Sequence, residues 1–164
     1  MEPQDAHLLH RWENRAKEWW LGAQLAPISL EAMQRFASGD HDVWSDRQLR
    51  LMLDVGDQTV GAFDLYDVDP RSGRAGVGMA VGQAFRNMGY ARVGLGLLMA
   101  YAFEHLGLRM LFAEVPVENP SSTRIFEEAG FHINGVLREW VRNGDHYSDL
   151  HVMQAFRAEL DGYA

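Results

Sequence analysis

A short run of residues with a glycine near its centre, Arg86-Asn87-Met88-Gly89-Tyr90-Ala91, joins a strand pattern to a helix pattern. Connections of this kind commonly bind anions, because backbone N–H groups and the positive end of the helix dipole converge there. Gly89 lets the backbone approach a phosphate without a Cβ in the way, and Arg86 and Arg92 add positive charge. Alone, such a connection is more often a simple turn, but its chemistry suits a pyrophosphate.

A second glycine-bearing run, Gly76-Val77-Gly78, superficially resembles a dinucleotide-binding fingerprint. Its context argues against that interpretation, because these glycines lie inside a strand pattern and the third glycine, Gly82, comes one residue late. No helix begins at the second glycine. Glycines within a strand more often indicate a bulge or a place where another group packs against the backbone. We therefore expect no dinucleotide site here, and in a transferase a ligand arm could lie along this strand.

The spacing of apolar residues predicts the elements that position these runs. Helical spacing and capping residues predict helices at residues 5–14, 29–39, 90–105 and 119–130. Alternation and apolar runs predict strands from residue 47 to the turn at 56–57, and at 59–68, 75–81, 110–117, 136–141 and 146–153. The first three strands form an antiparallel meander, the helix at 90–105 implies a crossover to a parallel strand, and Asn143-Gly144 predicts a hairpin. The predicted fold class is α+β with a mixed, mostly antiparallel sheet.

A second block follows the apolar strand: Asn119-Pro120-Ser121-Ser122-Thr123-Arg124-Ile125-Phe126-Glu127-Glu128-Ala129-Gly130-Phe131. It looks like the N-x-x-S/A…(Y/F)-E-x-x-GF helix of the GNAT superfamily of N-acetyltransferases, and Arg86-x-x-Gly89-x-Ala91 resembles that superfamily's R/Q-x-x-G-x-G/A signature. The resemblance covers roughly residues 5 to 157. The segment 136–139 and the Asn143-Gly144 hairpin, with Tyr147 and Asp149 beyond it, are similar to the branch of ribosomal-protein alanine and polyamine acetyltransferases.

This resemblance implies a splayed sheet flanked by about four helices, acetyl-CoA as cosubstrate, and direct transfer of acetyl to a primary amine in a ternary complex. The acceptor would be a small amine or a protein N-terminus. The Val81 N–H would polarise the acetyl carbonyl. The implied contacts with the cofactor are Met79, Ala80, Val81, Arg86, Asn87, Met88, Gly89, Tyr90, Ala91, Arg92, Asn119, Ser122 and Phe126. Asn119 is equally well explained as a helix N-cap before Pro120.

The proton chemistry departs from the usual pattern of the family. Phe126 stands where a tyrosine usually protonates the departing thiolate, and phenylalanine cannot donate a proton. Ser122 is the best remaining donor to the sulfur, although it also suits an ordinary first-turn serine. Glu114 is the first candidate for the general base, acting through water, and Asp64 is the second. Glu114 could instead face solvent or pair with an arginine.

Two acidic residues of the final hairpin, Glu139 and Asp149, could bind a cationic substrate or make cross-strand pairs.

Composition sets outer limits on these expectations. The 164 residues suit one domain spanning 1–164, and 15 basic against 23 acidic residues give a formal charge of −8. That charge disfavours nucleic acid and anionic membranes and slightly favours cationic amines. The absence of cysteine excludes disulfides, thiolate metal sites and cysteine nucleophiles.

We expect no metal and a cytoplasmic location, and the resemblance allows self-association as a homodimer. The alternative function is a non-catalytic acyl-CoA-binding module.

Overall fold

The computed structural model describes residues 1–21 and 26–160, which belong to two compact units, Met1–His41 and Asp42–Ala164. The first unit contains α1 (Ala6–Glu13) and α2 (Leu30–Ala37), close to the predicted bounds. Ser29 caps α2, since its Oγ accepts a hydrogen bond from the Ala32 N–H at 3.1 Å. A 3₁₀ turn, Pro3–Asp5, precedes α1, and residues 1–21 contain no strand.

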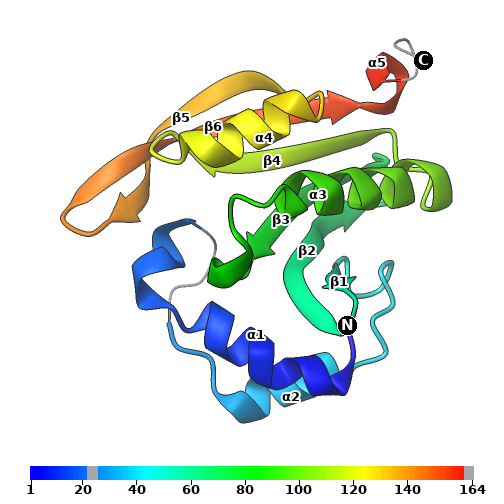
Figure 1. The fold of residues 1–164 in the computed structure, drawn as a ribbon. Coiled ribbons are helices and arrows are strands. Elements are labelled where there is room, and N and C mark those ends of the chain that lie inside the picture. Colours follow the sequence, from blue (N-terminus) through cyan, green and yellow to red (C-terminus); the bar gives the residue numbers. More distant parts are fainter. Residues whose placement is uncertain (22–25, 161–164) are drawn as a thin grey trace. The chain divides into compact units, whose positions relative to one another are not determined.

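The second unit is built on a six-stranded sheet whose strands lie in the order β1-β2-β3-β4-β6-β5 (Figure 1). β3 and β4 pair in parallel and all other neighbours pair antiparallel, which confirms the mixed, mostly antiparallel sheet. The strands are β1 (Leu49–Val55), β2 (Gln58–Asp69), β3 (Arg74–Val81), β4 (Met110–Pro116), β5 (His132–Asn143) and β6 (His146–Phe156). β5 is longer than predicted, because most of this edge strand is exposed and its sequence shows no alternation.

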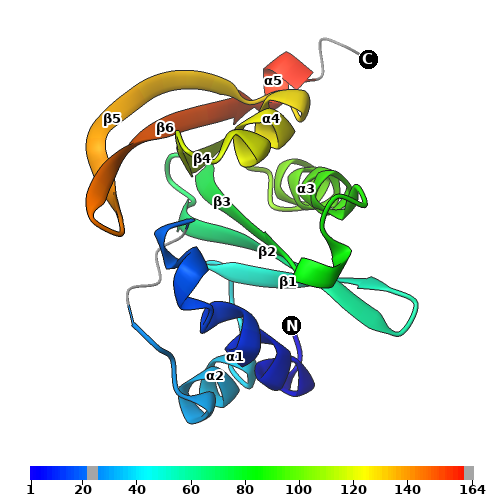
Figure 2. The same ribbon diagram turned by 60° about the vertical axis from the view of Figure 1, so that its left-hand side comes forward.

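Two helices, α3 (Tyr90–Ala100) and α4 (Pro120–Glu128), cover one face of this sheet (Figure 2). Their buried residues join those of the strands in one apolar core. The predicted helix at 90–105 ends in a π turn, Tyr101–His105, in which the Leu106 N–H reaches the Tyr101 carbonyl. Arg157, at the start of the short α5 (Arg157–Leu160), donates to the Phe103 carbonyl at 2.9 Å and so satisfies a group that a regular helix would bond internally.

Gly94 is required where α3 crosses β2. A Cβ at this position would lie 2.1 Å from the ring of Phe63, which is itself buried. We expect Gly94→Ala to lower the free energy of unfolding by about 3 kcal/mol, because a close-packed core resists added volume. Gly96 is the matched control, since a Cβ there meets no atom of a described residue within 4 Å.

Gly96→Ala should stabilise the chain by roughly 0.5 kcal/mol, because alanine favours helix. Denaturant unfolding measures both changes. Equal shifts for the two variants would contradict this packing.

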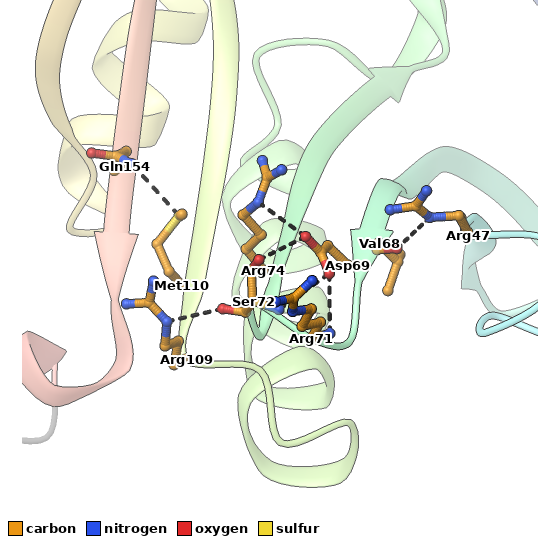
Figure 3. A network of polar contacts seen from close by, with 9 residues as sticks. All are labelled: Arg47, Val68, Asp69, Arg71, Ser72, Arg74, Arg109, Met110 and Gln154. Carbon is orange, nitrogen blue, oxygen red and sulfur yellow. Dashed lines mark hydrogen bonds and ion pairs between the residues drawn. The ribbon is translucent and has the colours of Figure 1, made fainter.

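At one end, β3 and β4 are closely joined through the turn between β2 and β3 (Figure 3). Asp69 accepts hydrogen bonds from the N–H groups of Arg71 and Ser72 and from the Ser72 hydroxyl, and these bonds lower the pKa of its carboxyl. Arg109, just before β4, donates from Nε to the Ser72 carbonyl and from N–H to the Gly73 carbonyl. At the opposite end, where β3 reaches Val81 and β4 reaches Pro116, the two strands are not paired with each other.

Candidate active site

The parallel ladder between β3 and β4 is short. It runs from Arg74↔Met110 to Gly76↔Phe112, although β3 continues to Val81 and β4 to Pro116. The two strands therefore part for about five residues, or roughly 16 Å at the usual rise of a strand. The predicted splay of the sheet is confirmed at this place.

The antiparallel ladder on the other side of β3 shows which backbone groups face this opening. The Gly82 N–H donates to the Val60 carbonyl at 2.9 Å, and the register continues without a shift from Val81 back to Gly76. Since hydrogen-bonded and non-bonded pairs alternate along such a ladder, the N–H groups of Val81 and Met79 point away from β2 and toward β4. The Ala80 backbone bonds to β2 instead. Of the three predicted strand contacts, Val81 and Met79 thus offer donors to a ligand in the opening.

The predicted pyrophosphate loop begins where β3 ends. Asn87 (φ +62°) and Gly89 (φ +85°) both adopt the left-handed conformation, and Gly89 starts α3 without a side-chain cap. Within the described chain, the N–H groups of residues 87–91 donate to no hydrogen bond. Met88 is exposed beside them. The loop therefore presents consecutive free N–H donors at a helix N-terminus, the arrangement that binds phosphate groups.

The two arginines expected to add charge to this loop are both engaged. Arg86 donates from Nε to the Val81 carbonyl at 3.2 Å, which braces the end of β3. Arg92 pairs with Glu128 of α4, which also accepts from Arg124 at 2.9 Å. Arg92 therefore joins α3 to α4, and the backbone N–H groups provide the loop's free hydrogen-bond donors.

The pH dependence of stability should report the Glu128 contacts. The hydrogen bond from Arg124, followed by the charge of Arg92, lowers the pKa of the Glu128 carboxyl from its ordinary 4.5. Because the folded pKa lies below the unfolded one, this stabilisation is complete above the unfolded pKa and is lost as pH falls through the folded value. The gap in melting temperature between the wild type and Glu128→Gln should stay constant near neutral pH and shrink below about pH 4.5. A gap that persists in acid would rule out this ion pair as its source.

Asn119 begins α4 as its N-cap, which the sequence allowed as the structural alternative. Its Oδ1 accepts from the Ser122 N–H and the Ser121 hydroxyl, and its Nδ2 donates to Ser122 Oγ at 2.9 Å. Ser122 Oγ thus accepts from Asn119, and its own proton has no acceptor among the described residues. That proton is available to a ligand, as a donor to sulfur requires.

Phe126 lies in the core. Its side chain is 3% exposed and meets Phe131 edge to face, with ring centroids 5.0 Å apart. Phe126 therefore packs α4 against the core, and a phenylalanine side chain has no proton to donate.

Glu114 lies on the part of β4 that has left β3. Its neighbours Ala113 and Val115 are buried on the helix-covered face, so Glu114 projects from the opposite face, where it is exposed. It forms no hydrogen bond or ion pair with a described residue. Burial and then the nearby Glu114 charge raise the pKa of the Tyr66 hydroxyl, which therefore stays protonated. Glu114 is a carboxylate free to accept a proton.

Tyr66 shares this face and was not predicted. Its ring lies across Gly76, where a Cβ would be 2.4 Å away, and meets Phe112 with centroids 5.6 Å apart. The two rings mark the last paired position before the strands part. Two features of the sequence could have indicated Tyr66: the strand glycines Gly76 and Gly78, and its position two residues after Asp64, on the same face of the strand.

Three other acidic residues are held by neighbours. Asp64 receives two hydrogen bonds from Arg50, at 2.6 and 2.9 Å. Asp149 Oδ1 accepts the Glu139 N–H at 2.7 Å, a side-chain contact across the hairpin. Glu118 contacts Asn143 and His146. These contacts were not predicted, because both partners lie more than twenty residues away along the chain.

Within residues 1–21 and 26–160, no helix is long and apolar enough to span a membrane. No group of three potential metal-binding side chains occurs in the same residues.

Known proteins resemble this chain in sequence and in fold. The family model for the acetyltransferase (GNAT) domain matches residues 1–132. A Bacillus licheniformis protein named uncharacterized N-acetyltransferase p20 is 26% identical over 65% of the chain, and spermidine N(1)-acetyltransferase of Vibrio cholerae is 25% identical over 65%. The matched parts span only 60% and 61% of those two relatives.

The crystal structure of a Vibrio cholerae spermidine N-acetyltransferase in complex with CoA and spermine has the same fold. The TM-score is 0.88 at 20% identity, over 96% of this chain and 93% of that one. Another structure of the Vibrio cholerae protein is dodecameric, with a TM-score of 0.84 at 20% identity over 100% and 95% of the two chains. With the family model matching well over half of its residues, the chain belongs to the acetyltransferase (GNAT) domain family.

Proposed function

We propose that this protein transfers the acetyl group of acetyl-CoA to a primary amine of a small polyamine-like molecule. The observation that carries the proposal is the opening between β3 and β4, with two inward N–H donors and a loop of free N–H groups at its mouth. Acetyl-CoA supplies the acyl group as a thioester, and its pyrophosphate matches the loop at 86–91. Its arm would enter the opening past Val81 and then Met79.

The chain's own residues fit the steps that such a transfer needs. The N–H of Val81, or of Met79 deeper in the opening, would hydrogen-bond the acyl carbonyl oxygen, worth on the order of 3 kcal/mol per donor. Glu114 would accept, through water, the proton that the attacking amine loses. Ser122 would donate a hydrogen bond to the sulfur as the carbon–sulfur bond breaks. These roles suit direct attack in a ternary complex.

Two observations support a polyamine as the acceptor. The sequence relative from Vibrio cholerae is named for spermidine, and the similar structure holds spermine. The net charge of −8 and an unpaired carboxylate at Glu114 suit a cationic amine over a neutral one. A protein N-terminus is the competing acceptor, and self-association stays a prediction.

A thiol-release assay with acetyl-CoA and a panel of spermidine, spermine and short peptides tests the proposal. We expect turnover with the polyamines and little with the peptides. Turnover with the peptides and not with the polyamines would indicate that the acceptor is a protein N-terminus.

A non-catalytic acyl-CoA-binding module is the second candidate, because Phe126 cannot act as an acid. Calorimetric titration that shows acetyl-CoA binding, with no thiol release on any acceptor, would favour it.

A further inference from the structure

The hairpin of β5 and β6 extends beyond the rest of the sheet. β6 pairs with β4 only as far as Pro116↔Leu150, while its pairing with β5 continues to Asn143↔His146. Residues 139–149 therefore overhang the end of β4 (Figures 1 and 2). Because β3 and β4 run parallel, this is the edge where β3 ends and the opening between them has its mouth.

A single carboxylate holds the tip of this overhang. Glu118 Oε2 accepts from Asn143 Nδ2 at 2.7 Å, and Oε1 lies 2.8 Å from His146 Nε2. The side chains of Glu118 and His146 are 41% and 58% exposed. Asn143 and His146 flank the hairpin turn, so both sides of the turn are fixed to the segment between β4 and α4.

The neighbouring residue fixes the middle of the overhang. The Val117 N–H donates to the Asp149 carbonyl at 2.9 Å. Asp149 in turn receives the Glu139 N–H within a bulge, where β5 loses its register between Leu137 and Val141. Glu139 has φ +50°, a conformation that a non-glycine residue holds only when its surroundings impose it.

The overhang presents large aromatic side chains to solvent. Trp140 is 62% exposed and Tyr147 is 60% exposed. Residues 117 and 118, which hold the overhang, immediately precede Asn119, the N-cap that also orients Ser122. One short segment thus connects the hairpin to the proposed sulfur donor.

Resting on the proposed function, we propose that Glu118 is a positioning residue that fixes the overhanging hairpin at the mouth of the opening and so shapes the acceptor side of the site. On the proposed function, the amine would reach the thioester at this edge, which the hairpin overhangs. Without Glu118 the tip loses both of its anchors, while the loop at 86–91 is untouched.

Kinetics of Glu118→Ala and the milder Glu118→Gln test this role. We expect Glu118→Ala to raise the KM for spermidine about tenfold, with kcat and the Kd of acetyl-CoA within about twofold of wild type. Glu118→Gln should fall between, because its amide oxygen can still accept one hydrogen bond. Asp145→Asn is the control, since it also removes one negative charge, from the hairpin turn that Glu118 holds, and Asp145 forms no hydrogen bond or ion pair with a described residue. An unchanged KM, or an equal loss of acetyl-CoA affinity, would overturn the proposal.

Hydrogen exchange supplies a readout that needs no turnover. Amides of residues 143–147 should exchange about tenfold faster in Glu118→Ala than in wild type or Asp145→Asn. Unchanged exchange would overturn the anchoring itself. If wild type transfers acetyl to no amine, the proposed function fails, and the exchange result still decides whether Glu118 anchors the hairpin.

Discussion

Replacing Gly89 by aspartate is expected to lower the affinity for acetyl-CoA about 100-fold, or about 2.7 kcal/mol. Gly89 lies in the left-handed conformation at the start of α3, with free N–H groups on either side. A carboxylate there would repel a pyrophosphate and stand in its way. Aspartate tolerates this backbone conformation better than most residues, and among residues 1–21 and 26–160 nothing lies within 4 Å of a Cβ at Gly89. The fold should therefore survive.

Gly107 provides a matched control for this variant. It also has a positive φ, +67°, and a Cβ there also meets no described atom within 4 Å. Gly107 lies, however, in the connection before β4, at the closed end of the strand pair. Gly107→Asp should cost similar stability and change the Kd of acetyl-CoA less than about twofold. Calorimetric titration measures the Kd of acetyl-CoA for both variants, and denaturant unfolding measures their stability. If the two variants bind acetyl-CoA with equal affinity, the loop at 86–91 does not bind the pyrophosphate.

The elements of this fold were predictable because local patterns encode them. Alternating apolar residues marked the strands, Asn143-Gly144 marked the hairpin turn, and Ser29 marked the start of α2, where its side chain does cap the helix. The long helix followed by an apolar strand also indicated the parallel pair. Each of these signals lies within a few residues of the element that it describes.

The details of the candidate site depend on contacts that no local pattern contains. The ladder of β3 and β4 stops at Gly76↔Phe112, where rings from β2 and β4 meet across a glycine. Glu118 reaches residues 25 and 28 positions away. The left-handed Glu139 needs Asp149 from the other strand. Such pairings arise only when the strands are assembled, so a sequence could supply candidates for the site but not their arrangement.

Glu114→Gln is expected to reduce kcat for acetyl transfer at least about 100-fold, with the Kd of acetyl-CoA within about twofold of wild type. Glutamine keeps the size of the side chain but cannot accept the amine's proton. Glu114 is exposed, forms no hydrogen bond or ion pair with a described residue and lies on the diverging part of β4, so its loss should cost little stability. Steady-state thiol release, with calorimetry for the cofactor, measures both quantities.

Asp64→Asn separates this role from a structural one. Asp64 is the second carboxylate of the same face, but its bidentate pair with Arg50 is largely buried, at 19% and 13% side-chain exposure. Asp64→Asn removes the negative charge from this largely buried ion pair, which should lower stability more than it lowers kcat. If kcat instead falls with Asp64→Asn and survives Glu114→Gln, the base is Asp64, and Arg50 is the residue that orients it. An equal loss in both variants would indicate that the two carboxylates handle the proton together through shared water.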